Sequence, residues 1–284
     1  MTEKPRESLA AARRVLALAR DTHKALRHVA RYLEQKLSSG AVISDEDERW
    51  VLTWHLALCT LGKDVAGDAI KTANAGSLRV ARMLNRCLFE YGCRAHHYHY
   101  DPSKAAEDGL QANAMGRKIM RPTRNLKGDM TDAQFRAFQV YMDAGSFEVK
   151  FPRVHVMMEN MLKNFGLSSR DVKQFMGWLD VEYTLGSGLI HGSQLAIWEV
   201  FTQPRSGMMR HTKTPHFKKG AELLRATCCM LILIAAVTWH CKRDLGVDPL
   251  VERLRALIEQ RGKTDIFKHD ALLSLFRLPD THVE

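Results

Sequence analysis

The chain has 284 residues, of which 45% are hydrophobic and 26% charged, and its formal net charge is +10. This composition is typical of a globular protein and excludes a disordered or fibrous one. The six cysteines lack the density and regular spacing of a disulfide framework, and no CxxC pair indicates a zinc ribbon. We therefore expect reduced thiols and a cytoplasmic protein. The charged N-terminus does not read as a signal peptide, so we expect no export.

Helical periodicity dominates the chain. Apolar residues recur every three or four positions, and alternating patterns typical of strands are scarce, which predicts an all-α protein. The predicted helices span 5–37, 45–73, 76–100, 103–120, 131–144, 154–165, 169–180, 182–201, 218–244, 248–261 and 265–277. The acids of Ser44-Asp45-Glu46-Asp47 favour a helix start. Without a long linker or a repeat, residues 1–284 form a single irregular helical bundle, to which helix 5–37 could be peripheral.

Arg86 and Glu90 lie one turn apart on the predicted helix 76–100, opposite an apolar stripe that includes Leu84, Leu88 and Tyr91. From periodicity alone this predicts an exposed ion pair, worth only a few tenths of a kcal/mol. If this face were turned inward, the pair would instead form part of a site.

The end of the same helix is rich in metal-binding residue types, in the stretch LFEYGCRAHHYHYD at 88–101. Cys93 and His97 are four residues apart and could share a metal, whereas His96 and His99 point away from His97. Structural zinc sites use four protein ligands, so two are too few. We expect polar histidines at a helix end, no metal and no cofactor.

The segment 180–201 holds three glycines and the most site-like side chains of the chain. Tyr183, Ser187 and His191 are four residues apart and share one helix face. A phenol, a hydroxyl and an imidazole on one face are typical of a catalytic site. Alternatively, His191 is a buried histidine satisfied by Ser187 and a backbone carbonyl. No GxSxG, P-loop or GxGxxG motif indicates a particular reaction.

A basic stretch follows, which we expect to be an irregular loop at 202–217. Such a loop is either functional or mobile, and clustered cations attract phosphate backbones. The alternative is a solvated surface, because no aromatic side chains are interleaved for base stacking. The candidate nucleic-acid-binding residues are Arg205, Arg210, Lys213, Lys218 and Lys219.

The stretch at 226–241, ATCCMLILIAAVTWHC, runs for sixteen residues without a formal charge. A membrane-spanning helix needs about 20 apolar residues. We therefore expect the central buried helix of the bundle rather than a membrane span.

Two motifs carry a family resemblance. ARMLNRCLFE at 81–90, followed by WLDVEYTLGSGLIHGS at 178–193, resembles a bacterial all-helical family known only as a domain of unknown function. Members share an Arg-x-x-x-Glu helix and a later Tyr-x-x-x-Ser-x-x-x-His helix. The resemblance covers residues 45 to 200 and implies that Arg86 and Glu90 face inward, toward Tyr183 and His191.

The later helix is also similar to the HEPN superfamily. Ribonucleases of that superfamily, found in toxin and phage-defence systems, use an arginine, a polar residue and a histidine on one helix, usually across a dimer. Gly186 stands where that arginine would lie. The spacing itself recurs from Arg94 to His99 and from Arg210 to His216.

Three functions remain open. The first is a non-enzymatic module, a homodimer or the accessory subunit of an unidentified protein partner, in which these residues form a buried polar network. The second is an HEPN-like protein acting on RNA, with His191 as acid/base or phosphate contact, Arg86 as phosphate partner and Glu90 orienting it. The third is a nucleic-acid binder that works through the basic loop alone.

Overall fold

The prediction of an all-α bundle is confirmed in the part of the chain that the computed structural model describes. These residues are 4–39, 43, 45–120, 154–164, 168–170, 172–173, 176, 201–202, 210–211 and 219–260. The helices are α1 (Lys4–Ser38), α2 (Glu46–Asn74), α3 (Leu78–Tyr100), α4 (Pro102–Met120), α6 (Val154–Asn164), α9 (Lys219–Cys241) and α10 (Asp248–Gln260). The predicted helices at 131–144 and 265–277, and most of 169–180 and 182–201, lie outside the described residues.

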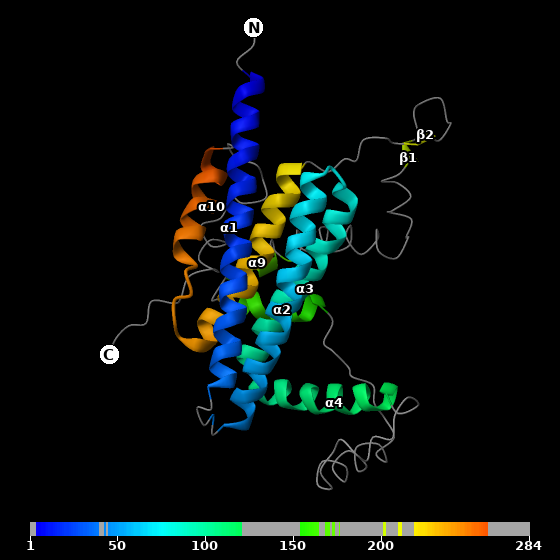
Figure 1. Cartoon of the computed structure of the whole chain (residues 1–284), viewed down its shortest axis with the longest axis vertical. Coiled ribbons are helices and arrows are strands. Elements are labelled where there is room, and N and C mark those ends of the chain that lie inside the picture. The colour runs from blue at the N-terminus through cyan, green and yellow to red at the C-terminus, as the bar shows by residue number, and fades with distance from the viewer. Residues whose placement is uncertain are drawn as a thin grey trace.

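The long helices run side by side along the long axis of the molecule, and α4 lies across one end of them (Figure 1). The pairing of α3 with α9 is the most extensive among the described elements, and α1 and α2 also pack against α9. The first part of α4 is anchored on α2, where the indole nitrogen of Trp54 donates to the carbonyl of Ala105 at 2.9 Å. The core therefore surrounds α9.

Helix α9 confirms the predicted buried helix near 226–241. Met230, Leu231, Leu233, Ile234 and Ala236 are fully buried. The helix is also long and apolar enough to cross a membrane, and 72% of its most apolar window is buried inside the bundle. Because neighbouring helices cover it on several sides, α9 is apolar around its circumference instead of along one stripe.

Helix α1, which we expected could be peripheral, contributes to this core. Val15, Leu18, Leu26 and Leu33 are fully buried, and the helix packs along both α2 and α9. Their three- and four-residue spacings place these side chains on one stripe, and burying that stripe needs contact along much of the helix.

The helix ends follow local chemistry. Asp45 caps α2, since its carboxylate accepts from the backbone nitrogens of Asp47 at 2.9 Å and Glu48 at 3.4 Å. This confirms the predicted helix start. After α9, Gly246 adopts a φ of 84°, in the left-handed region that glycine enters without strain. This turn leads into α10, which packs against α1.

The loop that we expected to be irregular at 202–217 contains part of a short antiparallel ladder, which corrects that prediction. Strand β1 (Phe201–Thr202) pairs with β2 (Arg210–His211), so that Phe201 lies opposite His211. A ladder of two residues is shorter than the period-2 pattern that identifies a strand in a sequence.

Two helical glycines allow α2 and α3 to approach α9 closely. A Cβ atom on Gly62 would lie 2.7 Å from Cδ2 of Leu233, and one on Gly92 would lie 2.7 Å from Cγ2 of Ile232. Both distances are too short for a real carbon contact, and the clash at Gly92 involves a branched side chain next to the backbone of Leu233. At Gly62 the clashing atom is the flexible end of the Leu233 side chain, which can move, whereas at Gly92 the backbones can pack at this spacing only without a side chain.

We predict that Gly92→Ala lowers the free energy of unfolding by about 1–2 kcal/mol, because an overpacking cost of about 2–3 kcal/mol outweighs the gain of about 1 kcal/mol in helix propensity. Gly67→Ala on α2 is the matched control. Its added Cβ would meet the His23 ring at 3.5 Å, an ordinary contact, so this variant should be as stable as wild type or more stable. Urea unfolding measures both. A Gly92→Ala variant as stable as wild type would contradict the close approach.

Candidate functional site

Helix α3 is buried or half-buried along nearly its whole length although it carries arginines, histidines and a glutamate. Only Val80 and Tyr100 of its residues are exposed. The helix packs against α2, α9 and α6. Polar groups in such a place must be paired inside the protein, since water cannot satisfy them. The candidate site is therefore the set of polar side chains that α3 presents to its neighbours.

A buried carboxylate joins α3 to the start of α9. Glu222 is fully buried, and its Oε1 lies 3.2 Å from Nε of Arg82 and 2.8 Å from a terminal nitrogen of Arg225. The side-chain amide of Asn85 donates to Oε2 of Glu222 at 3.1 Å and to the backbone carbonyl of Glu222 at 2.9 Å. We call Arg82, Asn85, Glu222 and Arg225 the Glu222 network.

The Glu222 network is a positioning device more than a source of net stability. The desolvation of two buried charges offsets much of the attraction between them, so an intact buried pair adds little net stability. Removing one partner leaves an uncompensated buried charge, which costs about 3–5 kcal/mol. Asn85 fixes the position of Glu222 relative to α3, because its amide donates to both the carboxylate and the backbone carbonyl of Glu222. A shift of α9 along α3 would break several of these contacts at once.

Arg86 and Glu90 form the predicted one-turn ion pair, with 2.8 Å between a terminal nitrogen of Arg86 and Oε1 of Glu90. The expectation of a solvent-exposed pair is wrong, because the side chains are only 13% and 26% exposed. Periodicity misleads here because α3 has helices on more than one side, and α6 brings buried methionines such as Met157 and Met158.

Most of the other predicted site residues lie outside the described residues. These are Tyr183, Ser187 and His191 of the glycine-rich segment, and Arg205, Lys213 and Lys218 of the basic stretch. Arg210 lies in β2. Lys219 is exposed at the start of α9, and its ammonium group donates to the carbonyl of Asn74 at 2.9 Å. The structure thus brings Arg86 to Glu90, and their relation to His191 stays a prediction.

The histidine-rich end of α3 is part of the interior. Cys93 and His96 are fully buried, and Nε2 of His96 donates to the carbonyl of Ile232 on α9 at 3.0 Å. Burial raises the pKa of the Cys93 thiol, which disfavours the thiolate that metals need. Among the described residues, no group of three or more His, Cys, Asp or Glu side chains is placed to hold a metal ion.

Two of these histidines belong to a larger group that the sequence does not reveal. His55 of α2, His96 and His99 of α3, and His240 of α9 form what we call the histidine cluster. The His55 and His240 rings are 5.1 Å apart edge to face, and Nδ1 of His99 lies 3.5 Å from Nδ1 of His240. Nε2 of His55 donates to the carbonyl of Ala95 at 3.0 Å.

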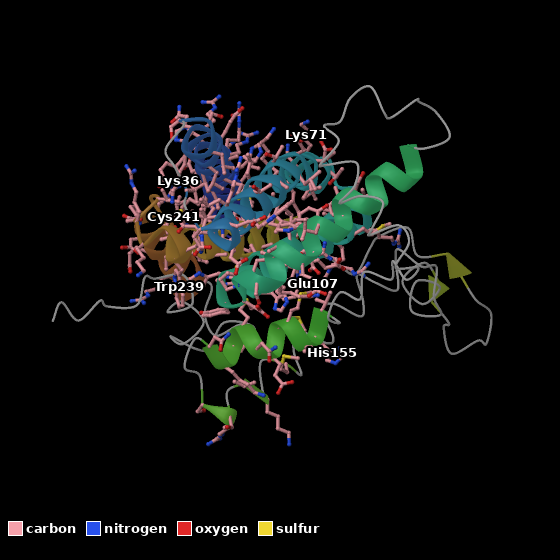
Figure 2. The ribbon with its side chains drawn as sticks, turned by 90° about the horizontal axis from the view of Figure 1, so that it is seen from below. Lys36, Lys71, Glu107, His155, Trp239 and Cys241 are labelled. Carbon is pink, nitrogen blue, oxygen red and sulfur yellow. The ribbon has the colours of Figure 1, made fainter. Side chains whose placement is uncertain are left out.

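Burial keeps the histidine cluster neutral. Desolvation lowers the pKa of His55 and His96 to about 3, and that of His99 and His240 to about 4. Neighbouring imidazoles add to this shift at the first three, and Lys36 of α1 adds to it at His240. Lys36 also pairs loosely with Glu48, at 3.6 Å. In Figure 2, Lys36, Cys241 and Trp239 follow one another along one side of the bundle.

A second buried carboxylate links α3 to α4. Asp108 is fully buried and accepts from the Tyr98 hydroxyl at 3.0 Å, and the Lys104 ammonium lies 3.0 Å from its other oxygen. Burial, followed by the charge of Asp108, raises the pKa of Tyr98. This phenol is therefore a structural hydrogen-bond donor and not a base.

Sequence reasoning did not single out Glu222, Asn85, His55, His240 or Asp108. The signal for Glu222 was present, because it is an isolated acid at the start of the most apolar helix. No comparable signal exists for His55 and His240, which meet α3 from distant parts of the chain.

Comparisons with known proteins add no further assignment. No protein-family profile, curated protein or solved structure matches this chain. The resemblances to the bacterial domain of unknown function and to the HEPN superfamily therefore stay predictions.

We predict that acidification destabilises the fold through the histidine cluster. Below pH 6.5 the unfolded chain gains protons that the folded chain, with its pKa values of about 3 to 4, does not. Stability is therefore complete above pH 6.5 and falls as the pH drops toward 4, by up to about 1.4 kcal/mol per pH unit for each of the fully buried His55 and His96, and by less for the half-buried His99 and His240, which solvent screens. Urea unfolding across this pH range measures the slope.

His99→Gln should reduce this slope, since it removes one buried titratable group. His28→Gln, which changes an exposed histidine on α1, is the control and should leave the slope unchanged. Equal slopes in wild type and His99→Gln would show that the cluster does not govern the acid sensitivity.

Proposed function

We propose that this chain is a non-enzymatic helical module of the bacterial cytoplasm, acting as a homodimer or as the accessory subunit of a protein partner. The observation that supports this most directly is the fully buried carboxylate of Glu222, which three side chains of the same chain satisfy. Catalytic carboxylates and cations need a path to substrate. The polar groups of this network are instead used in joining α3 to α9.

The reactive groups of the described residues are closed off in the same way. All six cysteines are free, and burial raises the pKa of Cys59, Cys93 and Cys229, which removes nucleophilic thiolate. The histidine cluster is neutral, with His55 and His96 fully buried and His99 and His240 half-buried, and Tyr98 donates to a buried carboxylate. Each is a suitable core group and a poor general base or nucleophile.

One observation favours a second candidate, an HEPN-like protein acting on RNA. The Arg86 side chain is 13% exposed and its guanidinium lies 2.8 Å from Oε1 of Glu90, so it is oriented and not fully enclosed. Such an arginine could contact a phosphate beside Tyr183, Ser187 and His191. The alternative match from Arg94 to His99 is less suitable, because His99 belongs to the histidine cluster, where its Nδ1 lies 3.5 Å from that of His240 and desolvation lowers its pKa to about 4.

The two candidates predict different results for purified protein mixed with end-labelled RNA, first in EDTA and then with Mg²⁺. A structural module leaves the RNA intact. Arg86→Ala should then lower the free energy of unfolding by about 1–3 kcal/mol, because it leaves Glu90 without its partner in a mostly buried place. Arg253→Ala is the matched control. Arg253 pairs with Asp21 at 2.7 Å on the surface and should matter by less than about 1 kcal/mol.

RNA cleavage by wild type that is lost in both Arg86→Ala and His191→Ala, with their melting temperatures preserved, would replace the structural proposal with the enzymatic one. Intact RNA together with equal stability losses in Arg86→Ala and Arg253→Ala would contradict the claim that the Arg86 pair is part of the interior.

A further inference from the structure

The exposed side of α1 carries six cations, most of which lie in one row along the helix. These are Arg13, Arg14, Arg20, Lys24, Arg27 and Arg31, all of which are exposed. None of them forms an ion pair within the part of the chain that the structure describes. The exposed residues of α1 include two acids, Asp21 and Glu34. Asp21 is already paired with Arg253 at 2.7 Å, so Glu34 is the exposed acid of α1 that remains to offset the cations. We call these six cations the α1 basic face.

A groove continues the α1 basic face toward α2. It has a volume of about 370 Å³, and its polar lining consists of Arg27, Arg31 and Glu34 from α1 with Thr60 and Lys63 from α2. Ala30 and Leu56 complete its lining. Lys63 pairs with Asp64 at 3.3 Å, which leaves Arg27 and Arg31 against Glu34, so the lining of the groove is still positive. Figure 1 shows α1 running along the outside of the bundle, with α10 on one side of it and α2 on the other.

Repulsion among these cations lowers the stability of α1 when no anion is bound. Like charges three or four residues apart repel each other, as in Lys24 with Arg27 and Arg27 with Arg31. A polyanion would relieve this repulsion. Five of the six cations are arginines, whose planar guanidinium groups bind phosphate through two parallel hydrogen bonds.

The dimensions and the chemistry of the face select among polyanions. From Arg13 to Arg31 the helix rises about 27 Å, which is the length of about eight base-pair steps of a duplex. The large exposed apolar side chains of the described residues, Leu61, Val80, Tyr100, Leu110 and Val156, all lie outside α1, so this face has none to insert into a membrane.

The same face also lacks features that single strands and RNA duplexes need. Tyr32, the aromatic residue nearest the row, is only partly exposed and lies under the guanidinium of Arg243, with 5.1 Å between that group and the ring centroid. It therefore offers no platform for stacking the bases of a single strand. Recognition of duplex RNA uses contacts to the 2′-hydroxyl groups in the minor groove, whereas this row offers cations alone.

We propose that the α1 basic face, with the groove between α1 and α2, binds the phosphate backbone of duplex DNA without reading its sequence. The inference goes beyond the proposed function and does not rest on it. It also places the contact on α1 and not on the basic residues 205–219. Affinity comes from neutralising phosphates and releasing counterions, so it must fall steeply as salt rises.

The test is the fluorescence anisotropy of a labelled DNA duplex of about 30 base pairs and arbitrary sequence, titrated with full-length protein between about 50 and 200 mM salt. The variant is Arg20→Gln/Lys24→Gln/Arg27→Gln/Arg31→Gln. Glutamine is a good helix former, and these exposed positions pack against nothing in the core, so α1 should keep its structure. The control, Arg49→Gln/Lys71→Gln/Lys163→Gln/Lys173→Gln, removes the same charge from exposed positions outside α1.

We expect the α1 variant to raise Kd at least about tenfold and to reduce the slope of log K against log salt by about one for each lost phosphate contact. The control should keep the wild-type slope. Equal losses in both variants would show that only net charge matters and would overturn the proposal. Tighter binding of a matched RNA duplex, or of a single strand, would overturn the choice of DNA.

Discussion

The contact between α3 and the start of α9 depends on one buried carboxylate. Glu222 lies where two helices pack most extensively, and its charge must be compensated by Arg82, Arg225 and Asn85 because water is excluded. These partners have a defined direction, which apolar contacts do not. The network thereby selects one register of α9 against α3 from the many that an apolar helix could adopt.

Other features of the bundle depend on that register. Gly62 and Gly92 admit Leu233 and Ile232 only when α9 is placed correctly along α2 and α3. At the far end of α9, His240 meets the histidine cluster, which is stable only while its imidazoles are neutral. The interior is thus polar at both ends and apolar between them. This arrangement explains how α3 can be buried or half-buried along nearly its whole length while carrying so many ionisable groups.

Much of the fold is predictable from sequence, because helix periodicity, the acidic cap at Asp45 and the uncharged run at 226–241 are local signals. The site is less predictable. A hydrophobic stripe in the sequence identifies one buried face of a helix, but α3 has more than one buried face. Arg86 lies opposite the stripe, and periodicity alone therefore predicts it at the surface. The sequence analysis also missed the exposed cations of α1, since apolar residues and Asp21 separate them in the sequence and only the helix gathers most of them on one side.

The most direct test of the Glu222 register is a double-mutant cycle with Arg82→Met, Glu222→Leu and the combined variant, each unfolded in urea. If the network sets the register, each single change lowers the free energy of unfolding by about 3–5 kcal/mol. The combined variant should then lose far less than the sum, with a coupling energy of at least about 2 kcal/mol. Additive losses, within about 0.5 kcal/mol, would mean that Arg82 and Glu222 act independently and that apolar packing alone positions α9.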